Sequence, residues 1–330
     1  MKKLRVGVIG VGHLGSLHAK MFAAIPSAEP VGVMDLDASR SGAIAGELGI
    51  ASFRSVSDLL KEVEAVSIAA STPAHFEIAK RAIESGVHVF VEKPITSTIG
   101  QAEELVALAR ERRIKVQVGH IERFNPALLA LEKYRLQPMF IESHRLAQFN
   151  PRGADVDVVL DLMIHDIDII VSLVHSPVEA IEANGVAVVS DTIDIANARL
   201  RFGNGCVANV TASRISQKKM RKMRLFQKDA YISVDFSDGV AEVFRLRGDG
   251  EEPGAGTMLL GEIGSGSVKR NIVYEQPEVK EVNALRYELE RFIECVLGGG
   301  EPAVSGEEGL RALRVAHDII ARIRQQKLVL

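Results

Sequence analysis

The chain has 330 residues, of which 25% are charged, and its formal net charge is −3. This small negative charge excludes the strongly basic classes that bind nucleic acid or acidic membrane surfaces. No apolar run approaches the roughly 20 residues that a membrane-spanning helix needs, and two cysteines cannot form a disulfide framework. We therefore expect a soluble cytoplasmic protein of two domains, with no membrane segment and no nucleic-acid partner.

The first 120 residues alternate between strand-like and helix-like patterns. Short apolar runs typical of strands lie at residues 4–9, 31–34, 65–69, 87–91 and 115–118. Helical patterns separate them, at residues 14–25, 38–48, 76–84 and 99–112. This alternation predicts βαβ units, and strands that are apolar throughout predict a parallel sheet buried on both faces. We place this doubly wound α/β domain at residues 1–121.

The pattern changes after residue 121. Helices are predicted at residues 123–134, 156–174, 283–297 and 306–326, and a glycine-rich loop at 248–269. A strand is predicted at 139–147, and residues 178–244 contain several strand patterns with little helix between them. The second domain, residues 122–330, is therefore expected to be α+β with a large, open and mostly antiparallel sheet.

The turn after the first predicted strand contains the glycine pattern GxGxxG at Gly10, Gly12 and Gly15. The first glycine permits a tight turn, the second lets a pyrophosphate approach the backbone, and the third allows close packing of helix on strand. The helix that begins there has His13 and Leu14 in its first turn, and its free N–H groups can bind phosphates. The alternative is a glycine-rich turn that binds no ligand, which the strand–turn–helix context disfavours.

Asp35 ends the second predicted strand, twenty residues after Gly15. A carboxylate at this place accepts hydrogen bonds from both ribose hydroxyls and repels a 2′-phosphate. We therefore expect the cofactor to be NAD. Arg40 is close in sequence and keeps NADP as the alternative.

Lys93 follows the fourth predicted strand, within Glu92-Lys93-Pro94. The carboxyl end of a parallel strand faces the crevice where ligands bind in such sheets. An amine there can take the proton of an alcohol while a nicotinamide accepts the hydride. Glu92 is expected to orient the lysine or to bond to the cofactor, and Pro94 is a candidate for a cis peptide bond. An exposed strand end without a catalytic role is the alternative.

A second cluster of ionisable residues lies in the predicted helix 156–174. Asp161, His165 and Asp168 stand at i, i+4 and i+7 and so share one face. Such groups on an apolar helix are unfavourable unless they border a cavity or pair with one another, and a histidine there can bind or relay a hydroxyl proton. Ordinary buried hydrogen bonding is the alternative. One histidine with carboxylates and no nearby cysteine is a poor zinc set, so we expect no metal.

These motifs, together with Thr72-Pro73-Ala74-His75, resemble those of the Gfo/Idh/MocA oxidoreductases along the whole chain. The resemblance implies an N-terminal Rossmann domain and a C-terminal α/β domain with an open sheet. It also implies an NAD-dependent enzyme that acts on CH–OH groups, in which Lys93 is catalytic together with Asp161 and His165. Thr72 and His75 follow a predicted strand and are expected beside the cofactor.

Residues 119–126, taken with 161–168, resemble the UDP-N-acetylglucosamine 3-dehydrogenase branch of that family. Enzymes of this branch oxidise the 3-hydroxyl of a UDP-linked N-acetylhexosamine to a 3-keto sugar. An aminotransferase then makes a 3-amino sugar for lipid A or O-antigen, the constituents of lipopolysaccharide. By this resemblance Arg123 would lie near the cofactor, and His120 and Asn125 near the sugar.

Two further arginines, Arg145 and Arg152, are candidates for binding the diphosphate of such a substrate. A guanidinium group can bind phosphate through two parallel hydrogen bonds, which a lysine cannot do. Many surface arginines have no such role, and that is the alternative for both residues.

Two other functions remain open at this point. The enzyme could act on a free polyol or sugar, such as an inositol or glucose, or the chain could be a non-catalytic NAD-binding regulatory protein. The joint presence of Lys93, Asp161 and His165 favours catalysis. Because an exposed apolar sheet face is unfavourable, we also expect a homodimer or homotetramer that forms through the sheet of the second domain.

Overall fold

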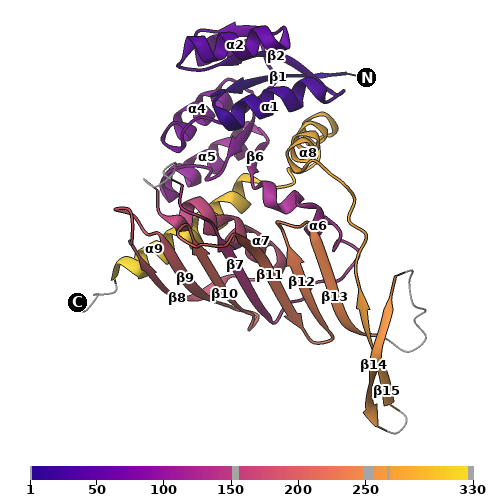
Figure 1. Cartoon of the computed structure of the whole chain (residues 1–330). Helices are drawn as coiled ribbons and strands as arrows, with labels where there is room; N and C mark the ends of the chain where they lie inside the picture. The colour runs from indigo at the N-terminus through magenta and orange to yellow at the C-terminus, as the bar shows by residue number, and fades with distance from the viewer. Residues whose placement is uncertain (1, 151–155, 248–255, 266–267, 326–330) are drawn as a thin grey trace. The chain divides into compact units, whose positions relative to one another are not determined.

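The computed structural model describes residues 2–150, 156–247, 256–265 and 268–325 (Figure 1). The chain forms two compact units. Unit 1 contains Met1–Ile121 and Asn283–Arg314, and unit 2 contains Glu122–Val282 and Val315–Leu330. The division after residue 121 lies where the sequence placed it. The assignment of 283–314 to the second domain was wrong, because this segment returns to unit 1.

Unit 1 has a six-stranded sheet in which each neighbouring pair of the described strands is parallel. The order is β3 (Ala51–Phe53), β2 (Ala28–Met34), β1 (Leu4–Ile9), β4 (Ala65–Ile68), β5 (His88–Glu92) and β6 (Val116–Gly119). This order reverses between β1 and β4, where dinucleotide-binding folds place their ligand crevice. The predicted parallel sheet is confirmed. The three-residue edge strand β3 was not predicted.

Helices cover the sheet of unit 1, and several of them begin at a capping side chain. They are α1 (His13–Ala24), α2 (Ala38–Leu48), α3 (Val56–Leu60), α4 (Thr72–Glu84), α5 (Ile99–Arg112), α8 (Ala284–Gly298) and the first part of α9 (Gly306–Gln325). Asp37, Ser55 and Thr98 accept hydrogen bonds from the first backbone N–H groups of α2, α3 and α5. These side chains explain where the three helices start.

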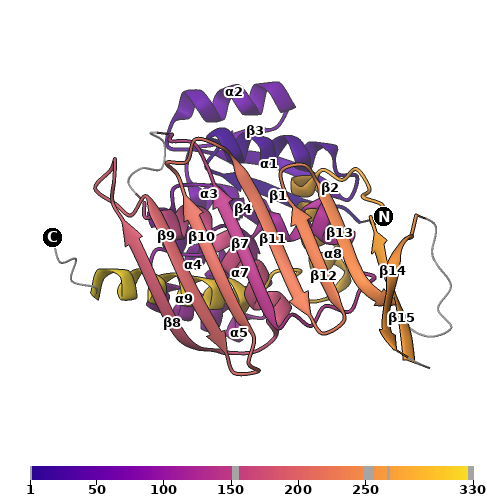
Figure 2. The ribbon, with the colours of Figure 1, turned by 60° about the horizontal axis from the view of Figure 1, so that its bottom comes forward.

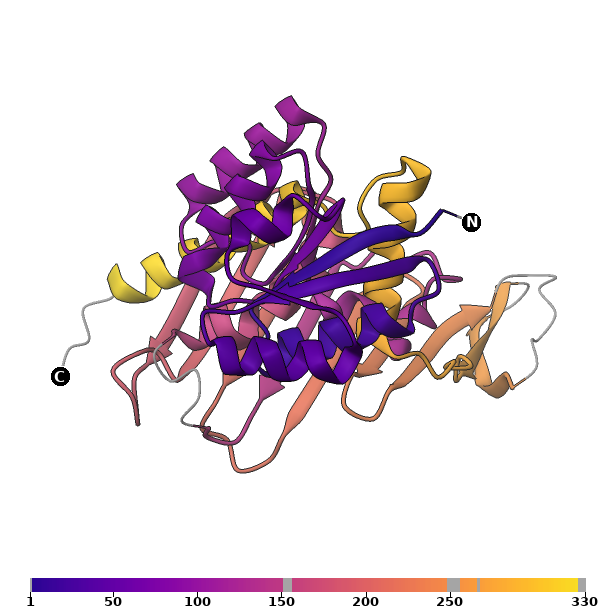
Figure 3. The ribbon, with the colours of Figure 1, turned by 90° about the horizontal axis from the view of Figure 1, so that it is seen from above.

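Helix α8 completes the core of unit 1 although it is distant in sequence. It lies beside α1, and Figure 3 shows it in yellow next to the indigo and purple strands. Its fully buried Phe292 stands edge-to-face against Phe90 of β5, with ring centroids 5.8 Å apart. The burial of apolar side chains from Leu285 to Ile293 in this core explains why the segment returns to unit 1.

Unit 2 has a nine-stranded sheet, shown face-on in Figure 2. The order is β14 (Met258–Ser265), β15 (Val268–Glu275), β13 (Val240–Arg247), β12 (Ala230–Asp235), β11 (Met220–Gln227), β7 (Phe140–Leu146), β10 (Val207–Ser213), β9 (Ile195–Phe202) and β8 (Val178–Val186). Among these described strands, only β7 and β10 pair in parallel. The predicted mostly antiparallel sheet is confirmed.

Three predictions for unit 2 were wrong in detail. The predicted loop 248–269 contains strand β14 and the start of β15, and its residues 248–255 and 266–267 lie outside the described part of the chain. The predicted helix 123–134 is instead a 3₁₀ turn, η1 (Ile121–Phe124), and a short helix, α6 (Pro126–Leu129). Asn125 interrupts it because a residue before proline avoids the helical backbone conformation. The predicted helix 156–174 is a π-helical segment, η2 (Val159–Met163), followed by α7 (Ile164–Val174).

Helix α7 packs on one face of the sheet of unit 2, against β7 and β10. Along β7, Ile141, Ser143 and Arg145 are buried on that face, whereas Glu142 and His144 on the other face are half-buried. The sheet thus has one packed face and one open face. Among the helices that the structure describes, none is long and apolar enough to cross a membrane.

Candidate active site

The glycine turn of unit 1 has the geometry that its sequence predicts. Gly10 has φ +81°, a left-handed conformation that favours glycine. A Cβ atom on Gly15 would lie 1.8 Å from the carbonyl oxygen of Gly10, so that position must be glycine for the turn to close. A Cβ atom on Gly12 would have no described atom within 4 Å. The turn is therefore tight at its first and third glycines and open at the second, where a ligand phosphate can approach.

The N-terminus of α1 adjoins this open position. Gly12 is its N-cap residue, and within the described helix no side chain caps the first turn and no acidic residue stands in it. The first N–H groups of a helix have no partner inside the helix and lie at the positive end of its dipole. His13 and Leu14 are exposed in the same turn. This arrangement suits a pyrophosphate group.

Asp35, at the end of β2, is tied to the glycine turn. Its Oδ2 accepts a hydrogen bond from the backbone N–H of Val11 at 2.7 Å, and its Oδ1 accepts one from Asp37 at 2.9 Å. The Arg40 guanidinium lies 3.4 Å from Asp35. Arg40 is thus paired with a carboxylate at the place where a 2′-phosphate would have to bind, which agrees with the expectation of NAD.

Lys93 directly follows β5 and is half-buried. The Lys93–Pro94 peptide bond is cis, as anticipated. His75 is buried on α4, and its two ring nitrogens lie 2.9 Å from the carbonyl oxygen of Pro94 and 3.0 Å from that of Ala70. The imidazole therefore fastens the turn that follows Lys93 to the end of β4. This contact gives His75 a structural role, and Thr72 lies half-buried in the first turn of α4. Their place beside the cofactor stays a prediction.

Glu92 forms the link between Lys93 and a buried histidine. Its Oε2 accepts a hydrogen bond from the Lys93 N–H at 3.3 Å, and its Oε1 lies 3.1 Å from Nε2 of His18. That second contact is close enough for an ion pair but is not aligned as a hydrogen bond. His18, on α1, is fully buried and its Nδ1 lies 2.8 Å from the Ser67 hydroxyl. The chain Ser67–His18–Glu92 thus connects α1 to the backbone of Lys93.

The sequence analysis did not select His18. A signal was available, because His18 stands three residues after Gly15 on the helix face that packs on the sheet. A polar residue on an otherwise apolar packing face needs a partner. That partner, Glu92, is distant in sequence and could be identified only from the fold.

Asp161 and His165 both belong to unit 2 and are half-buried, Asp161 in η2 and His165 in the first turn of α7. Asp168, the third member of the predicted face, is buried and bonded to Arg123 through two hydrogen bonds, Nε to Oδ2 at 2.6 Å and Nη2 to Oδ1 at 2.7 Å. This pairing commits the Arg123 guanidinium to the chain. The cofactor contact of Arg123 stays a prediction.

Arg145 is buried and bonded to carboxylates from two other segments. Its Nε donates to Asp166 at 2.6 Å and its Nη1 donates to Glu122 at 2.7 Å. Burial opposes its charge, but these two carboxylates outweigh burial and raise the pKa of Arg145 above its ordinary value. The guanidinium has no surface to offer to a diphosphate, so this prediction was wrong. Arg152 lies outside the described residues.

His120 and Asn125 complete the predicted set. His120 is buried directly after β6 and belongs to unit 1. Asn125 caps α6 by accepting from Ala127 N–H at 3.1 Å, and its amide nitrogen donates to the carbonyl oxygen of Phe236 at 3.1 Å. Asn125 thus has a structural function that the sequence analysis did not predict.

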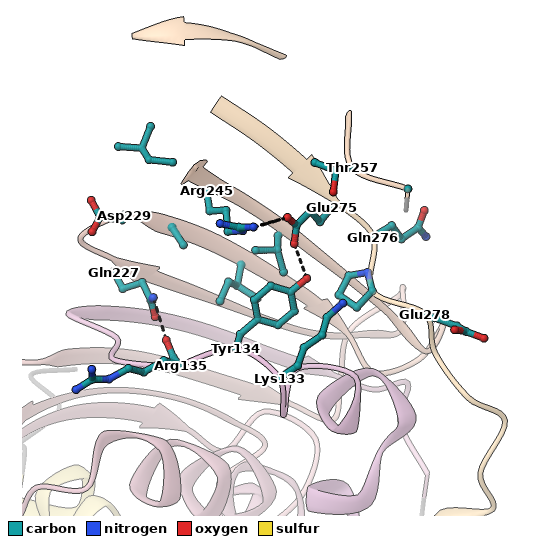
Figure 4. Close-up of a pocket in the computed structure, with 16 residues that line it drawn as sticks. Lys133, Tyr134, Arg135, Gln227, Asp229, Arg245, Thr257, Glu275, Gln276 and Glu278 are labelled. Atoms are coloured by element: carbon teal, nitrogen blue, oxygen red, sulfur yellow. Dashed lines mark hydrogen bonds and ion pairs between the residues drawn. The ribbon is translucent and has the colours of Figure 1, made fainter. Parts of the chain in front are cut away.

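A cavity of about 700 Å³ lies in unit 2 (Figure 4). It is lined by residues other than those of the predicted site. Tyr134 and Arg245 both donate hydrogen bonds to Glu275 in its wall, at 2.7 Å for the tyrosine hydroxyl. Burial opposes ionisation of Glu275, but these donors outweigh it and keep its pKa below the usual range. None of the predicted site residues is among the described residues that line this cavity. We therefore do not place the chemistry there.

The chain is similar to known oxidoreductases along its whole length. Residues 4–120 match the family model described as "Oxidoreductase family, NAD-binding Rossmann fold", and residues 137–242 match the model of the "GFO/IDH/MocA C-terminal domain". The UDP-N-acetylglucosamine 3-dehydrogenase of Acidithiobacillus ferrooxidans is 38% identical over 96% of both chains. Its crystal structure covers 98% of both chains with a TM-score of 0.86.

More distant relatives share the fold. The myo-inositol 2-dehydrogenase of Thermotoga maritima is 24% identical over 99% of this chain and 98% of its own. A levoglucosan dehydrogenase solved with NADH and levoglucosan is 19% identical, with a TM-score of 0.82. The glycine turn, the strand order and these similarities agree, and a non-catalytic regulatory protein is no longer an alternative. The chain is an NAD-binding dehydrogenase that belongs to the Gfo/Idh/MocA oxidoreductase family.

Proposed function

We propose that the protein oxidises the 3-hydroxyl of UDP-N-acetylglucosamine, or of a close UDP-N-acetylhexosamine relative, to a 3-keto sugar with NAD as the oxidant. The observation with the most weight is the 38% identity over 96% of the chain to an enzyme of that name. The presence of Lys93, Asp161 and His165 in one chain adds chemical support, because oxidation of an alcohol needs a proton acceptor and groups that hold the hydroxyl.

The residues of unit 1 fit NAD. The open position at Gly12 and the uncapped N-terminus of α1 would hold the pyrophosphate. Asp35 would accept hydrogen bonds from the adenosine ribose, and its contact with Arg40 leaves that cation less able to bind a 2′-phosphate. The Asp35 carboxylate and its contact with Arg40 both favour NAD over NADP.

The chemical roles follow from the residue types. Bound nicotinamide supplies the acceptor for the hydride that leaves C3 with its electron pair. Lys93 in its neutral form takes the hydroxyl proton on Nζ, and the C–O single bond becomes a carbonyl. His165 and Asp161 bind the hydroxyl and hold its proton toward the base. Glu92 fixes the backbone at Lys93 through its hydrogen bond from the lysine N–H.

The 3-keto product points to the next step in the cell. A ketone is the substrate of an aminotransferase, so we propose that the product becomes a 3-amino sugar in the synthesis of lipid A or O-antigen of lipopolysaccharide. We propose that the enzyme works in the cytoplasm, because its two cysteines, Cys206 and Cys295, are free, as is usual in a reducing compartment. His120 is retained as a candidate for contact with the sugar.

The open face of unit 2 supports assembly with a second copy. One row of half-buried aromatic side chains crosses five neighbouring strands on this face, in register: Phe140, Phe226, Tyr231, Phe244 and Tyr274. Neighbouring ring centroids are 4.9 to 5.6 Å apart. A continuous apolar row of this kind is unfavourable in water. We therefore propose a homodimer or homotetramer through this face, and a monomer in light scattering would contradict it.

The test of the function is a substrate panel. Formation of NADH is followed by absorbance with UDP-N-acetylglucosamine, UDP-N-acetylgalactosamine, free N-acetylglucosamine, glucose and myo-inositol. We expect turnover with a UDP-N-acetylhexosamine and a 3-keto product in mass spectrometry. Turnover of myo-inositol without turnover of UDP-sugars would replace this proposal with the second candidate, which the similarity to myo-inositol 2-dehydrogenase supports more weakly.

A further inference from the structure

Two consecutive residues at the start of unit 2 are connected to the helix that contains His165, Arg123 directly and Glu122 through Arg145. Arg123 holds Asp168 through two hydrogen bonds of 2.6 and 2.7 Å, and the Asp168 side chain is only 1% exposed. Planar contacts of this type fix both distance and orientation. Helix α7 is thereby fastened to η1 at a point three residues after His165.

A second connection reaches α7 through β7. Asp166, the residue after His165, accepts from Arg145 at 2.6 Å and from the Ser143 hydroxyl at 2.8 Å. Arg145 in turn donates to Glu122 at 2.7 Å. We call the set Glu122, Arg123, Arg145, Asp166 and Asp168 the α7 clamp. It joins η1, β7 and α7, and within unit 2 it holds α7 at two neighbouring positions.

Stability alone does not account for the α7 clamp. Buried ion pairs are often no more stabilising than apolar side chains of the same volume, because each charge loses its hydration. A helix packed by apolar residues alone can rotate slightly about its axis with little change in free energy. The ion pairs of Asp166 with Arg145 and of Asp168 with Arg123 form together at only one rotation of α7 about its axis. This rotation sets the direction in which the His165 side chain leaves α7.

We propose that Glu122, Arg123 and Arg145 are positioning residues for the reaction, which act through Asp166 and Asp168 by fixing the rotation of α7. The inference rests on the role of His165 in the proposed function. It also gives a physical reason for the presence of the Glu122-Arg123 and His165-Asp166-Ile167-Asp168 sequences in one chain. They are joined by ion pairs, with no need for the arginines to touch the substrate.

The test compares Arg123→Lys with the wild type, in the full-length enzyme and with the substrate turned over fastest in the panel. Lysine keeps the charge and loses the two-point contact. We expect kcat to fall about 10-fold or more, as small misplacements of catalytic groups do, while the Kd for NAD, measured by fluorescence, stays unchanged. Asp168→Asn is the second variant, for use if Arg123→Lys folds poorly. It should likewise lower kcat and leave the Kd for NAD unchanged. Thermal unfolding is recorded for each.

The matched control is Arg245→Lys, which weakens a similar pair with Glu275 in the same unit. That pair is 22% and 14% exposed and lies on β13 and β15, in no contact with α7 among the described interactions. The control should lower the unfolding temperature to a similar extent and leave kcat within about 2-fold. A kcat loss in the control equal to that of Arg123→Lys would show a general effect of destabilisation and overturn the proposal.

The decisive measurement uses His165→Asn. If the α7 clamp acts through His165, Arg123→Lys should reduce kcat much less in the His165→Asn background than in the wild type, because effects through one group are not additive. Equal losses in both backgrounds, or a lower unfolding temperature with unchanged kcat, would overturn the clamp's positioning role. Full activity of His165→Asn by itself would instead refute the role of His165 in the proposed function, so the two failures are distinguishable.

Discussion

The backbone N–H of Val11 donates a hydrogen bond of 2.7 Å to Oδ2 of Asp35, so the glycine turn is directly connected to the carboxylate that we propose binds ribose. The same carboxylate accepts from Asp37 and lies beside Arg40. Asp35 is therefore held in place before any cofactor binds. We therefore propose Asp35 as a determinant of cofactor choice.

Replacing Asp35 by serine should reduce NAD affinity about 10- to 100-fold, the effect of losing charge-assisted hydrogen bonds to ribose. The substitution should also release Arg40 from its contact with residue 35, so that Arg40 can bind a 2′-phosphate. NADP affinity should therefore rise while NAD affinity falls. Calorimetric binding of both cofactors to Asp35→Ser and to Asp35→Ser/Arg40→Ala would measure this. Unchanged NAD binding in the single variant would contradict the assignment.

Alanine at Gly12 and at Gly15 should have opposite consequences. A methyl group at Gly12 meets no described atom within 4 Å, and its φ of −64° is accessible to alanine, so folding should persist while NAD affinity falls about 10-fold or more through lost phosphate contact. A methyl group at Gly15 would overlap the Gly10 carbonyl oxygen, so that variant should unfold at a much lower temperature.

Gly46→Ala is the control for these glycine variants, because Gly46 lies within α2 and a Cβ there is free of described neighbours. Alanine in a helix interior should raise stability by about 0.5–1 kcal/mol. Thermal unfolding and NAD binding of the three variants separate folding from ligand contact. A Gly15→Ala variant with normal stability would contradict the geometry of the turn.

Lys93→Met should lower kcat about 100- to 10,000-fold, the usual contribution of a positioned acid–base group. The Kd for NAD should change far less, because the cofactor is held mainly by the glycine turn and Asp35. Stopped-flow measurement of NADH formation in a single turnover tests the chemical step directly and avoids masking by slow product release. Lys80→Met, an exposed lysine of α4 paired with Glu104, is the control and should behave as the wild type. A fully active Lys93→Met enzyme would exclude this base.

His18→Leu should reduce kcat by about 10-fold, because Glu92 would lose the contact that holds it against the Lys93 backbone. The leucine leaves a buried carboxylate oxygen with one partner fewer, which should destabilise unit 1 by about 1–3 kcal/mol. Ser67→Ala removes only the hydrogen bond behind His18 and should have a smaller effect on both quantities. If His18→Leu lowered stability and left kcat as it was, the histidine would serve folding alone.

Acid stability should depend on Asp194. Burial alone would raise its pKa, but hydrogen bonds from the N–H groups of Val188, Val189 and Ser190 and from the Ser190 hydroxyl outweigh it and lower the pKa to about 2. Because the folded pKa lies below the ordinary value of 3.8, the stabilisation is complete above about pH 4 and is lost as the pH falls toward 2.

The Asp194 prediction is checked by thermal unfolding between pH 2 and pH 6. The difference in unfolding temperature between the wild type and Asp194→Asn should be largest at the upper end and should shrink as the pH falls from about 4 to 2. Asp191→Asn, an exposed neighbour in the same loop, should leave the pH dependence unchanged. A constant difference across this range would show that ionisation of Asp194 contributes nothing.

The parallel sheet could be predicted because its strands are buried on both faces, and the bounds of β1, α2 and α5 agree with the sequence to the residue. Strand β3 could not be predicted, since it has only three residues and two of them are exposed, which gives no apolar pattern. The glycine turn and Asp35 were also predictable, because the elements that position them are adjacent in sequence.

The partners of charged residues could not be predicted, and this explains the error at Arg145. Arg145 lies 21 residues from Asp166 and 23 from Glu122, and only the fold of unit 2, which places η1 and α7 beside β7, brings the three together. An arginine destined for a buried pair has the same appearance in a sequence as one that binds phosphate. The π-helical turn before α7 was likewise hidden, because its composition is that of an ordinary apolar helix.

The return of residues 283–314 to unit 1 means that neither unit is a continuous piece of polypeptide. A fragment that stops at residue 121 would expose Phe90 and the other side chains that α8 covers, and is expected to aggregate. A soluble cofactor-binding fragment would have to join residue 121 to residue 283 by a short linker. The chain passes from one unit to the other three times, after residues 121, 282 and 314. Gene fusions and truncations of this enzyme should therefore take all three passages into account.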